Sequence, residues 1–216
     1  MNNVIIVDDH PIVREGFKKL NDSEKDLKVI GTAESSSEAA ELIPKELPDI
    51  AMVDLSLKDR SGIELIKDLQ AICPDVKILV VSLHDEEVYA ERALKAGAKG
   101  FIMKAEAVDD IINAVKKVLN GEMYLSRAMQ SRLIEKLAKG KINQQEDSVD
   151  ILSDREFEVF QLIGRGLDSK SIAKKMQLSV KTVETYKSHI KIKLELSNSI
   201  ELIQRAVEWK MEHKIA

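Results

Sequence analysis

Short apolar runs alternate with longer amphipathic stretches over the first 121 residues of the chain. The short runs have the length and apolar content of buried strands, and the longer stretches repeat their apolar residues with the period of a helix. This alternation is typical of a parallel sheet with helices on both faces. We therefore predict an α/β domain over residues 1–121, with strands at residues 3–7, 27–33, 49–53, 77–81 and 100–103.

The segments between these strands begin and end with residues that favour helix termini. Pro11 suits a first helical turn, where its missing N–H costs no hydrogen bond. Two Ser/Glu pairs have the spacing of a capping box, in which a hydroxyl and a carboxylate satisfy free backbone donors: Ser35 with Glu38, and Ser61 with Glu64. Two glycines stand just past periodic stretches, where a left-handed residue commonly ends a helix: Gly97 and Gly121.

The pattern changes after residue 121. Residues 126–139 predict one more amphipathic helix, and residues 140–149 are polar and aperiodic, so we interpret residues 122–149 as a linker with one helix. Ser153 and Glu156 have capping-box spacing before a helical stretch that ends near Gly166. Further helices are predicted at residues 169–176, 180–194 and 199–212. Residues 150–216 should therefore form a second, small, all-helical domain.

The composition agrees with two folded domains. Hydrophobic residues make up 44% of the 216 residues, which is enough to bury a core in each domain. Cys73 is the single cysteine, which excludes an intrachain disulfide and a Cys-rich zinc site. The chain begins without a signal-peptide pattern, and no uncharged apolar run approaches the roughly 18 residues of a membrane span. We expect a cytoplasmic protein with no membrane partner.

The net charge of −4 hides an asymmetry between the two parts of the chain. Lys and Arg outnumber Asp and Glu by 12 to 10 from Ser148 onward, whereas the preceding part is acidic. Residues 170–193 hold seven lysines and one acid, Glu184. Such a concentration of positive charge is typical either of a surface that meets a polyanion or of a solvated helix face.

Polar residues of several kinds follow the predicted strands. Parallel strands place their carboxyl ends along one edge of the sheet, and ligands bind there, where the strand order reverses. The residues at these ends are Asp8 and Asp9 for the first strand, Asp54 for the third, Ser82 for the fourth and Lys104 for the fifth. The first and third strands flank the reversal in a five-stranded sheet of order 2-1-3-4-5. We therefore expect three carboxylates to converge beside a hydroxyl and an amine.

Three close carboxylates repel one another unless their pKa values rise or a divalent cation lies between them. Mg²⁺ fits best, because it accepts a few carboxylates, keeps several waters and takes further ligands from phosphate oxygens. An ionised carboxylate beside such a cation can accept a phosphoryl group without a base. Asp54 is central on the edge, so we assign it as the acceptor, with Asp9 and Asp54 as metal ligands and Asp8 acting through a water. Each of these residues alone is also common in turns and helix caps.

The segments VDDHP, MVDLSL…SG, VVSLHD and GFIMK together resemble the receiver domain of two-component response regulators, over residues 1 to about 121. The resemblance implies a flavodoxin-like or CheY-like fold in which Asp54 receives phosphate from a sensor histidine kinase. It also implies that Asp8 and Asp9 are the acidic pair for Mg²⁺, and that the backbone carbonyl of Ser56 is a further metal ligand. Lys58 stands where the family usually has proline, which predicts a less rigid loop after Asp54.

The same resemblance implies a switch around the phosphoryl group. Ser82 would supply the hydroxyl drawn to the phosphoryl group, Lys104 would form an ion pair with that group, and Phe101 would be the aromatic residue of the switch. Without the resemblance, Phe101 would be interpreted as an ordinary core aromatic residue. Phosphate adds charge and acceptor oxygens, and their binding would draw the loops inward and shift a two-state surface. His84, two residues after Ser82, is placed either to affect water access to the phosphoryl group or simply as an exposed loop residue.

The second domain has the pattern of a helix-turn-helix. A helix is followed by the break Gln177-Leu178-Ser179 and by a second helix, which in this motif enters the major groove. Projection at about 100° per residue places Val183 and Ile190 on a packed face. The opposite face carries polar residues that can contact bases, and lysines that can contact phosphates: Lys181, Glu184, Thr185 and Ser188, flanked by Lys187, Lys191 and Lys193.

Residues 150 to about 210 resemble the LuxR-type helix-turn-helix of the NarL/FixJ subfamily of response regulators, through motifs such as LSDRE, Ile172-Ala173 and Thr182-Val183. The resemblance implies that residues 181–191, including Thr182, form the recognition surface. It further implies that a homodimer binds paired half-sites on double-stranded DNA. Tyr186 replaces a more usual histidine, and Asp168 and Ser171 replace a more usual Ser/Thr and Glu pair.

These observations predict a phosphorylation-controlled transcription regulator that is not an enzyme. Two alternatives stay open. The receiver could be a phosphate-independent dimerisation module on a constitutive regulator. The chain could instead be a Mg²⁺-dependent phosphohydrolase with an aspartyl-phosphate intermediate, but that enzyme would need an acid two residues after Asp54, where this chain has Ser56.

Overall fold

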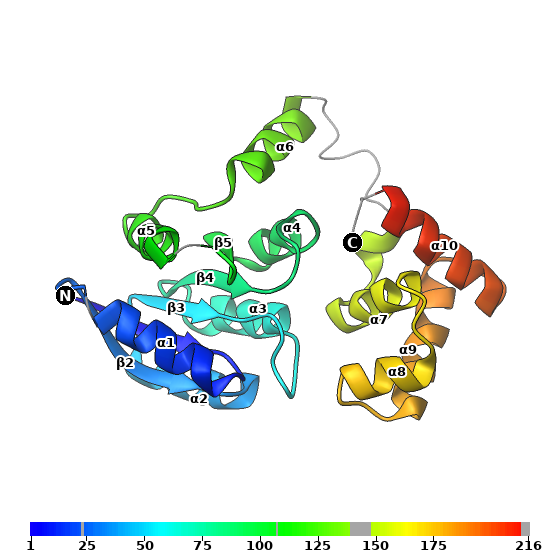
Figure 1. The fold of residues 1–216 in the computed structure, drawn as a ribbon, viewed down its shortest axis with the longest axis horizontal. Helices are drawn as coiled ribbons and strands as arrows, with labels where there is room; N and C mark the ends of the chain where they lie inside the picture. The colour runs from blue at the N-terminus through cyan, green and yellow to red at the C-terminus, as the bar shows by residue number, and fades with distance from the viewer. Residues whose placement is uncertain (23, 107, 139–147, 213–216) are drawn as a thin grey trace. The chain divides into compact units, whose positions relative to one another are not determined.

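The computed structural model describes residues 1–22, 24–106, 108–138 and 148–212 of the chain (Figure 1). Packing divides the chain into two compact units, Met1–Leu133 and Ile134–Ala216, and each has its own core. Within the described residues, no helix has both the length and the apolar character that crossing a membrane requires.

The first unit is built on a five-stranded parallel sheet of order β2-β1-β3-β4-β5, which confirms the predicted order. The strands are β1 Asn2–Val7, β2 Leu27–Ala33, β3 Ile50–Val53, β4 Lys77–Ser82 and β5 Gly100–Met103. All four residues of β3 are buried, as expected for a central strand that is covered on both faces. The register of β1 against β2 shifts once, between Val4 and Ile5.

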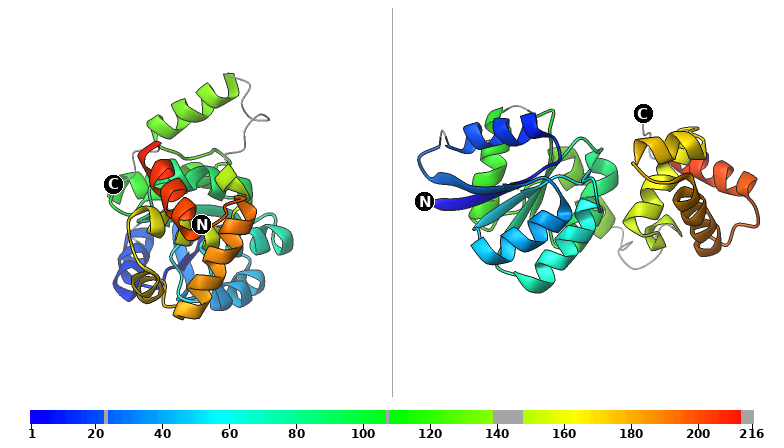
Figure 2. Two further views of the ribbon diagram at one scale, coloured as in Figure 1. Left: turned by 90° about the vertical axis from the view of Figure 1, so that its right-hand side faces the viewer. Right: turned by 90° about the horizontal axis from the view of Figure 1, so that it is seen from below.

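Helices cover both faces of this sheet (Figure 2). They are α1 Pro11–Asp22, α2 Ser36–Glu46, α3 Gly62–Ile72, α4 Glu86–Ala96 and α5 Val108–Leu119. Successive strand residues point to opposite faces, so Val4 and Ile6 of β1 pack in one cluster with Ile111 and Val115 of α5. Phe17 of α1 packs against the same cluster. The sheet is therefore doubly wound, and the carboxyl ends of its strands are left open at one edge.

The helix termini in this unit confirm part of the sequence prediction and correct part of it. Ser35 and Ser61 are the N-caps of α2 and α3, as predicted. The two predicted capping boxes, however, are incomplete, because neither glutamate side chain accepts from the backbone N–H of its N-cap serine. Glu38 accepts a hydrogen bond from the backbone N–H of Glu34 (2.7 Å), one residue before the cap, and Glu64 pairs with Arg60 at 3.3 Å. Other partners competed for these carboxylates.

The helix α6, Arg127–Ala138, spans the boundary between the two units. In its first half Met129 is buried, and an ion pair between Arg132 and Glu87 of α4 at 3.2 Å ties the helix to the first unit. The predicted helix over residues 126–139 is thus confirmed apart from its ends. Most of the predicted polar linker lies outside the described residues. Its last two positions begin a 3-10 helix, Ser148–Ile151, in which Val149 is buried.

Among residues 148–212, four helices follow this 3-10 turn: α7 Asp154–Gly164, α8 Ser169–Lys175, α9 Val180–Lys193 and α10 Ser199–Glu212. Its core is built around Trp209, which Phe157 and Phe160 contact edge-on with ring centroids 5.3 and 6.0 Å away. Two buried residues of α9, Val183 and Ile190, belong to the same core. The face of α9 predicted to be packed is confirmed at these positions.

The turn between α8 and α9 has a defined backbone geometry. Gln177 adopts a left-handed conformation with φ of 55°, and the N–H of Leu178 donates to the carbonyl of Ala173 at 2.9 Å. These features define a Schellman motif, which ends a helix by satisfying its last carbonyls. Ser179 then caps α9 by accepting from the N–H of Thr182 (3.0 Å). The predicted helix-turn-helix is therefore present in the described residues.

Candidate phosphoacceptor site and nucleic-acid interface

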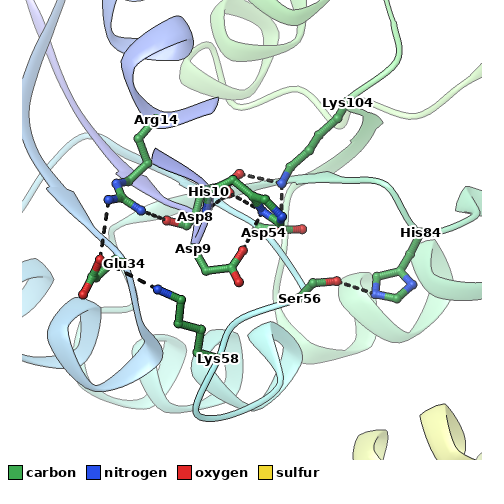
Figure 3. A network of polar contacts seen from close by, with 10 residues as sticks. All are labelled: Asp8, Asp9, His10, Arg14, Glu34, Asp54, Ser56, Lys58, His84 and Lys104. Carbon is green, nitrogen blue, oxygen red and sulfur yellow. Dashed lines mark hydrogen bonds and ion pairs between the residues drawn. The ribbon is translucent and has the colours of Figure 1, made fainter. Parts of the chain in front are cut away.

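Three carboxylates converge at the open edge of the sheet, where β1 and β3 end (Figure 3). Asp8 and Asp54 are 2% and 3% exposed, and Asp9 is half-buried. Each of these residues, and His10, offers one ligand atom within 4.8 Å of all the others. The parallel topology alone accounts for this convergence, because it brings the ends of β1 and β3 side by side.

Lys104 supplies the counter-charge from the end of β5. Its Nζ lies 2.5 Å from Oδ2 of Asp8 and 2.8 Å from Oδ2 of Asp54, and its side chain is only 6% exposed. The other oxygen of Asp54, Oδ1, is buried and has no hydrogen-bond partner among the described residues. Buried carboxylate oxygens without a partner are rare in native structures, and an absent ion is one accepted explanation. The cluster can therefore hold a metal ion, and its hard oxygen donors fit Mg²⁺.

The remaining residues implied for the site and its switch lie in two places. Ser82 is fully buried, and its Oγ accepts from the backbone N–H of His84 at 3.2 Å. The side chains of His84 and Ser56 share a hydrogen bond of 2.8 Å, which links the loops that follow β4 and β3. Phe101 is fully buried within the sheet. The structure thus brings Ser56, Ser82 and Lys104 to the edge that carries Asp54, and places Phe101 in the core.

Two further residues, which the sequence did not identify, contact the acidic cluster. His10 places Nδ1 2.6 Å from Oδ1 of Asp9 and 3.3 Å from Oδ1 of Asp8. Arg14, one turn into α1, donates to the backbone carbonyl of Asp8 at 2.6 Å and lies 3.6 Å from Glu34. The signal for His10 was its position directly after the acidic pair. No comparable signal identified Arg14.

The loop after Asp54 is restrained by the residue that follows Lys58. The carboxylate of Asp59 accepts from the backbone N–H groups of Ser36 and Ser37 at 2.8 and 2.9 Å, and from the Ser37 hydroxyl at 2.7 Å. Burial alone would raise the pKa of Asp59, but these hydrogen bonds outweigh it and lower the pKa to about 2. The loop is therefore tied to the first turn of α2. The lower rigidity expected from Lys58 stays a prediction.

Gly62 closes the same loop by a close backbone approach. Its N–H donates to the carbonyl of Leu55 at 3.0 Å. A Cβ atom at this position would lie 2.2 Å from the carbonyl oxygen of Asp54, so a larger residue would have to displace the backbone of the acceptor. The glycine is thus required by the position of Asp54.

The predicted recognition residues lie along α9. Lys181, Glu184, Thr185 and Ser188 are exposed, and Thr182, Lys187 and Lys191 are half-buried. Thr185 and Ser188 each donate to the carbonyl four residues earlier at 3.0 Å, which leaves their oxygens able to accept. Lys193, expected to flank the phosphates, instead bonds the buried Glu156 at 2.6 Å. The face opposite Val183 and Ile190 is therefore polar and accessible.

Glu184 lies in a small network on this face. Its Oε1 accepts from the hydroxyl of Ser169 in α8 and from Nζ of Lys187 at 3.0 Å. The hydrogen bond from Ser169, and then the one from Lys187, hold the pKa of Glu184 below its ordinary value. This acid is therefore ionised at neutral pH.

Comparison with known proteins agrees with both units. Residues 4–116 match the family of response regulator receiver domains, and residues 150–206 match the luxR family of bacterial regulatory proteins. The first match covers more than half of the chain. The chain therefore belongs to the response regulators that carry a receiver domain followed by a LuxR-type DNA-binding domain, a family of regulators and not of enzymes.

Individual relatives resemble the chain over nearly its whole length. The oxygen regulatory protein NreC of Staphylococcus epidermidis is 35% identical over 213 residues, which cover 96% of this chain and 98% of that protein. RcsB of Salmonella enterica serovar Typhimurium, solved bound to the promoter rprA with phosphomimetic BeF3-, is 30% identical over 94% of this chain and 96% of its own, with a TM-score of 0.60. The receiver domain of the putative regulator NarL from Mycobacterium tuberculosis is 30% identical over 56% of this chain and 98% of its own, with a TM-score of 0.54.

Proposed function

We propose that this chain is a transcription regulator whose binding to DNA depends on phosphorylation of Asp54 by a sensor histidine kinase. The observation that carries the proposal is the environment of Asp54. This carboxylate is buried, one oxygen is held by Lys104 at 2.8 Å, and the other has no partner among the described residues. A carboxylate needed only for the fold would be expected to have both oxygens satisfied.

The residues of the chain support an in-line phosphoryl transfer. A carboxylate oxygen of Asp54 attacks the phosphorus of a phosphohistidine; the new O–P bond forms as the N–P bond breaks, and the leaving imidazole takes a proton from solvent. Lys104 stays close enough to pair with the phosphoryl oxygens. Asp8, Asp9, Asp54 and the carbonyl of Ser56 would hold Mg²⁺, which when bound neutralises charge on those oxygens.

The switch would act through Ser82 and Lys104. In the unmodified form the Ser82 oxygen accepts from His84 and Lys104 pairs with two carboxylates. A phosphoryl group offers new acceptor oxygens, and contacts of both side chains with these oxygens would favour a state in which the loops that carry them have moved toward Asp54. The buried Phe101 lies on β5, three residues before Lys104, where it can repack with such a movement.

The output would be duplex DNA bound by α9 as a homodimer on paired half-sites. The polar and accessible face of α9 and its lysines support this part of the proposal. Because DNA is the proposed target and a kinase the proposed donor, the proposal places the protein in the cytoplasm.

The test is phosphoryl labelling of Asp54→Asn beside the matched variant Asp75→Asn, which changes an exposed aspartate of the same unit. Acetyl phosphate and Mg²⁺ are expected to label the wild type and Asp75→Asn but not Asp54→Asn, as read by intact mass, and EDTA is expected to abolish the label. Footprinting should then show that labelling increases promoter affinity. Undiminished labelling of Asp54→Asn would remove Asp54 from its role. Equal promoter affinity with and without phosphorylation would favour the alternative of a constitutive regulator whose receiver is only a dimerisation module.

A further inference from the structure

Glu184 differs in charge from the lysines around it on the polar face of α9. It is the one acid within residues 170–193, which hold seven lysines, and its side chain is 53% exposed on the polar face of α9. DNA phosphates repel a carboxylate, so an exposed acid on a DNA-binding helix weakens binding unless it gains a specific contact.

The network around Glu184 holds its carboxylate in one place. The hydroxyl of Ser169 and the ammonium of Lys187 both donate to Oε1, and Lys187 also donates to Oγ of Ser169 at 3.0 Å. Three groups from two helices thus form a closed set of contacts. Oε2 has no hydrogen-bond partner among the described residues, which leaves it able to accept.

The chemistry of the major groove limits what this oxygen can accept from. An ionised carboxylate only accepts, and the groove offers donors at the N4 amino group of cytosine and the N6 amino group of adenine. Adenine places its N7 acceptor beside that donor, where it would repel the second carboxylate oxygen. Cytosine places only its C5–H on that side, so it is the better partner.

We propose that Glu184 determines specificity by selecting a cytosine in each half-site through its N4 amino group, and that Ser169 and Lys187 are positioning residues that hold the carboxylate for this contact. The inference rests on the proposed function, because it requires α9 to lie in the major groove. It assigns Lys187 a role different from simple phosphate neutralisation.

The two roles of Lys187 predict different results. A lysine that only contacts phosphate would, when removed, weaken binding to all sequences equally and lower the salt dependence. A lysine that positions Glu184 would, when removed, relax the preference at one base pair. Lys187→Met should therefore lose discrimination at the same base pair as Glu184→Gln, but less of it.

The experiment is a selection from a randomised duplex library with the full chain, treated with acetyl phosphate and Mg²⁺. Wild type, Glu184→Gln and the control Glu208→Gln, an exposed glutamate of α10, are compared. We expect wild type and Glu208→Gln to select cytosine at one position of each half-site, with about fivefold to tenfold discrimination for a single base contact. Glu184→Gln should lose that discrimination and bind unrelated duplex more tightly, because the repulsive charge is gone.

The possible results distinguish failure of the cytosine assignment from failure of the proposed DNA-binding function. An unchanged base profile for Glu184→Gln, or selection of adenine at that position by the wild type, would overturn the assignment of cytosine while leaving the DNA-binding function intact. Failure of the wild type to select any duplex would overturn the proposed function and the inference together. Thermal unfolding of Glu184→Gln, followed by Trp209 fluorescence, verifies that the helical unit is folded.

Discussion

The two units of this protein place their charged groups in opposite ways. In the receiver unit Asp8, Asp54 and Lys104 are buried and come from three segments that are far apart in the sequence. In the helical unit the charged residues proposed for binding are mostly exposed and belong to a single helix. Buried charges depend on one another strongly, whereas exposed charges contribute little to stability. The receiver cluster is therefore part of the fold, and the charges of α9 are available to a partner.

Glu156 is the exception in the helical unit. It is buried and completes the predicted capping box, because its carboxylate accepts from the backbone N–H of Ser153 at 2.8 Å. The same carboxylate also accepts from Nζ of Lys193 at 2.6 Å. The contrast between the units is thus between buried and exposed charge rather than between sheet and helix. Three stability measurements test it.

The largest effect is expected for Lys104→Met, which leaves two buried carboxylates without their cation. Removing one partner of a buried ion pair costs about 3–5 kcal/mol. The loss should fall on the receiver unit alone. Because Trp209 is the single tryptophan and lies in the helical core, urea unfolding by fluorescence reports the helical unit while circular dichroism reports both. Added Mg²⁺ should recover part of the loss.

The matched control is Lys187→Met on α9. Its side chain is 20% exposed but its partner Glu184 is 53% exposed, so both unfolding transitions should stay within about 0.5 kcal/mol of the wild type. Equal losses for Lys104→Met and Lys187→Met would contradict the comparison between the units.

An intermediate effect is expected for Glu156→Gln in the helical unit. Burial opposes the charge of Glu156, but the bonds from Lys193 and Ser153 outweigh it and hold the pKa below the ordinary 4.5. We expect a loss of about 1.5 kcal/mol at neutral pH, the value for a hydrogen bond to a charged group. Since the folded pKa is depressed, this stabilisation is present above pH 4.5 and is lost as the pH falls through the lower folded value. Fluorescence-detected unfolding should show a shallower acid dependence for the variant than for Glu208→Gln.

Apart from the control, the smallest effect is expected for Asp59→Asn. The carboxylate caps two N–H groups of α2 from a distant loop, and loss of such a cap costs on the order of 1 kcal/mol for this exposed residue. With a pKa of about 2 against an ordinary 3.8, the contribution is present above pH 3.8 and disappears as the pH falls toward 2. The free energy of unfolding at pH 7, measured by circular dichroism, should be lower for Asp59→Asn than for Asp75→Asn, and the difference should vanish below about pH 2. A difference that persists there would exclude the cap as its cause.

The sequence predicted most of the fold and the members of the acidic cluster for one physical reason. In a parallel sheet, strand order determines which chain ends meet, so Asp8, Asp54 and Lys104 could be brought together without knowing any side-chain conformation. The period of the apolar residues likewise predicted the buried face of α9 at Val183 and Ile190.

The features that were missed depend on pairs of side chains from distant segments. Asp59 with the start of α2, and Ser169 with Glu184, are contacts that no periodic pattern encodes. The incomplete capping boxes have a different, local cause, because Arg60 lies four residues before Glu64 and competes for its carboxylate. Spacing therefore specifies which contacts are available, and both local and tertiary neighbours decide which are made.

The position of Trp209 near the end of α10 has a consequence for how the protein is made. The rings of Phe157 and Phe160 complete their packing only against a residue about fifty positions later. During translation the helical unit therefore remains without its central ring until residue 209 has left the ribosome, while the receiver unit, whose strands are all complete by Met103, can already fold. The receiver unit can thus be complete before the part of the chain that it is proposed to control.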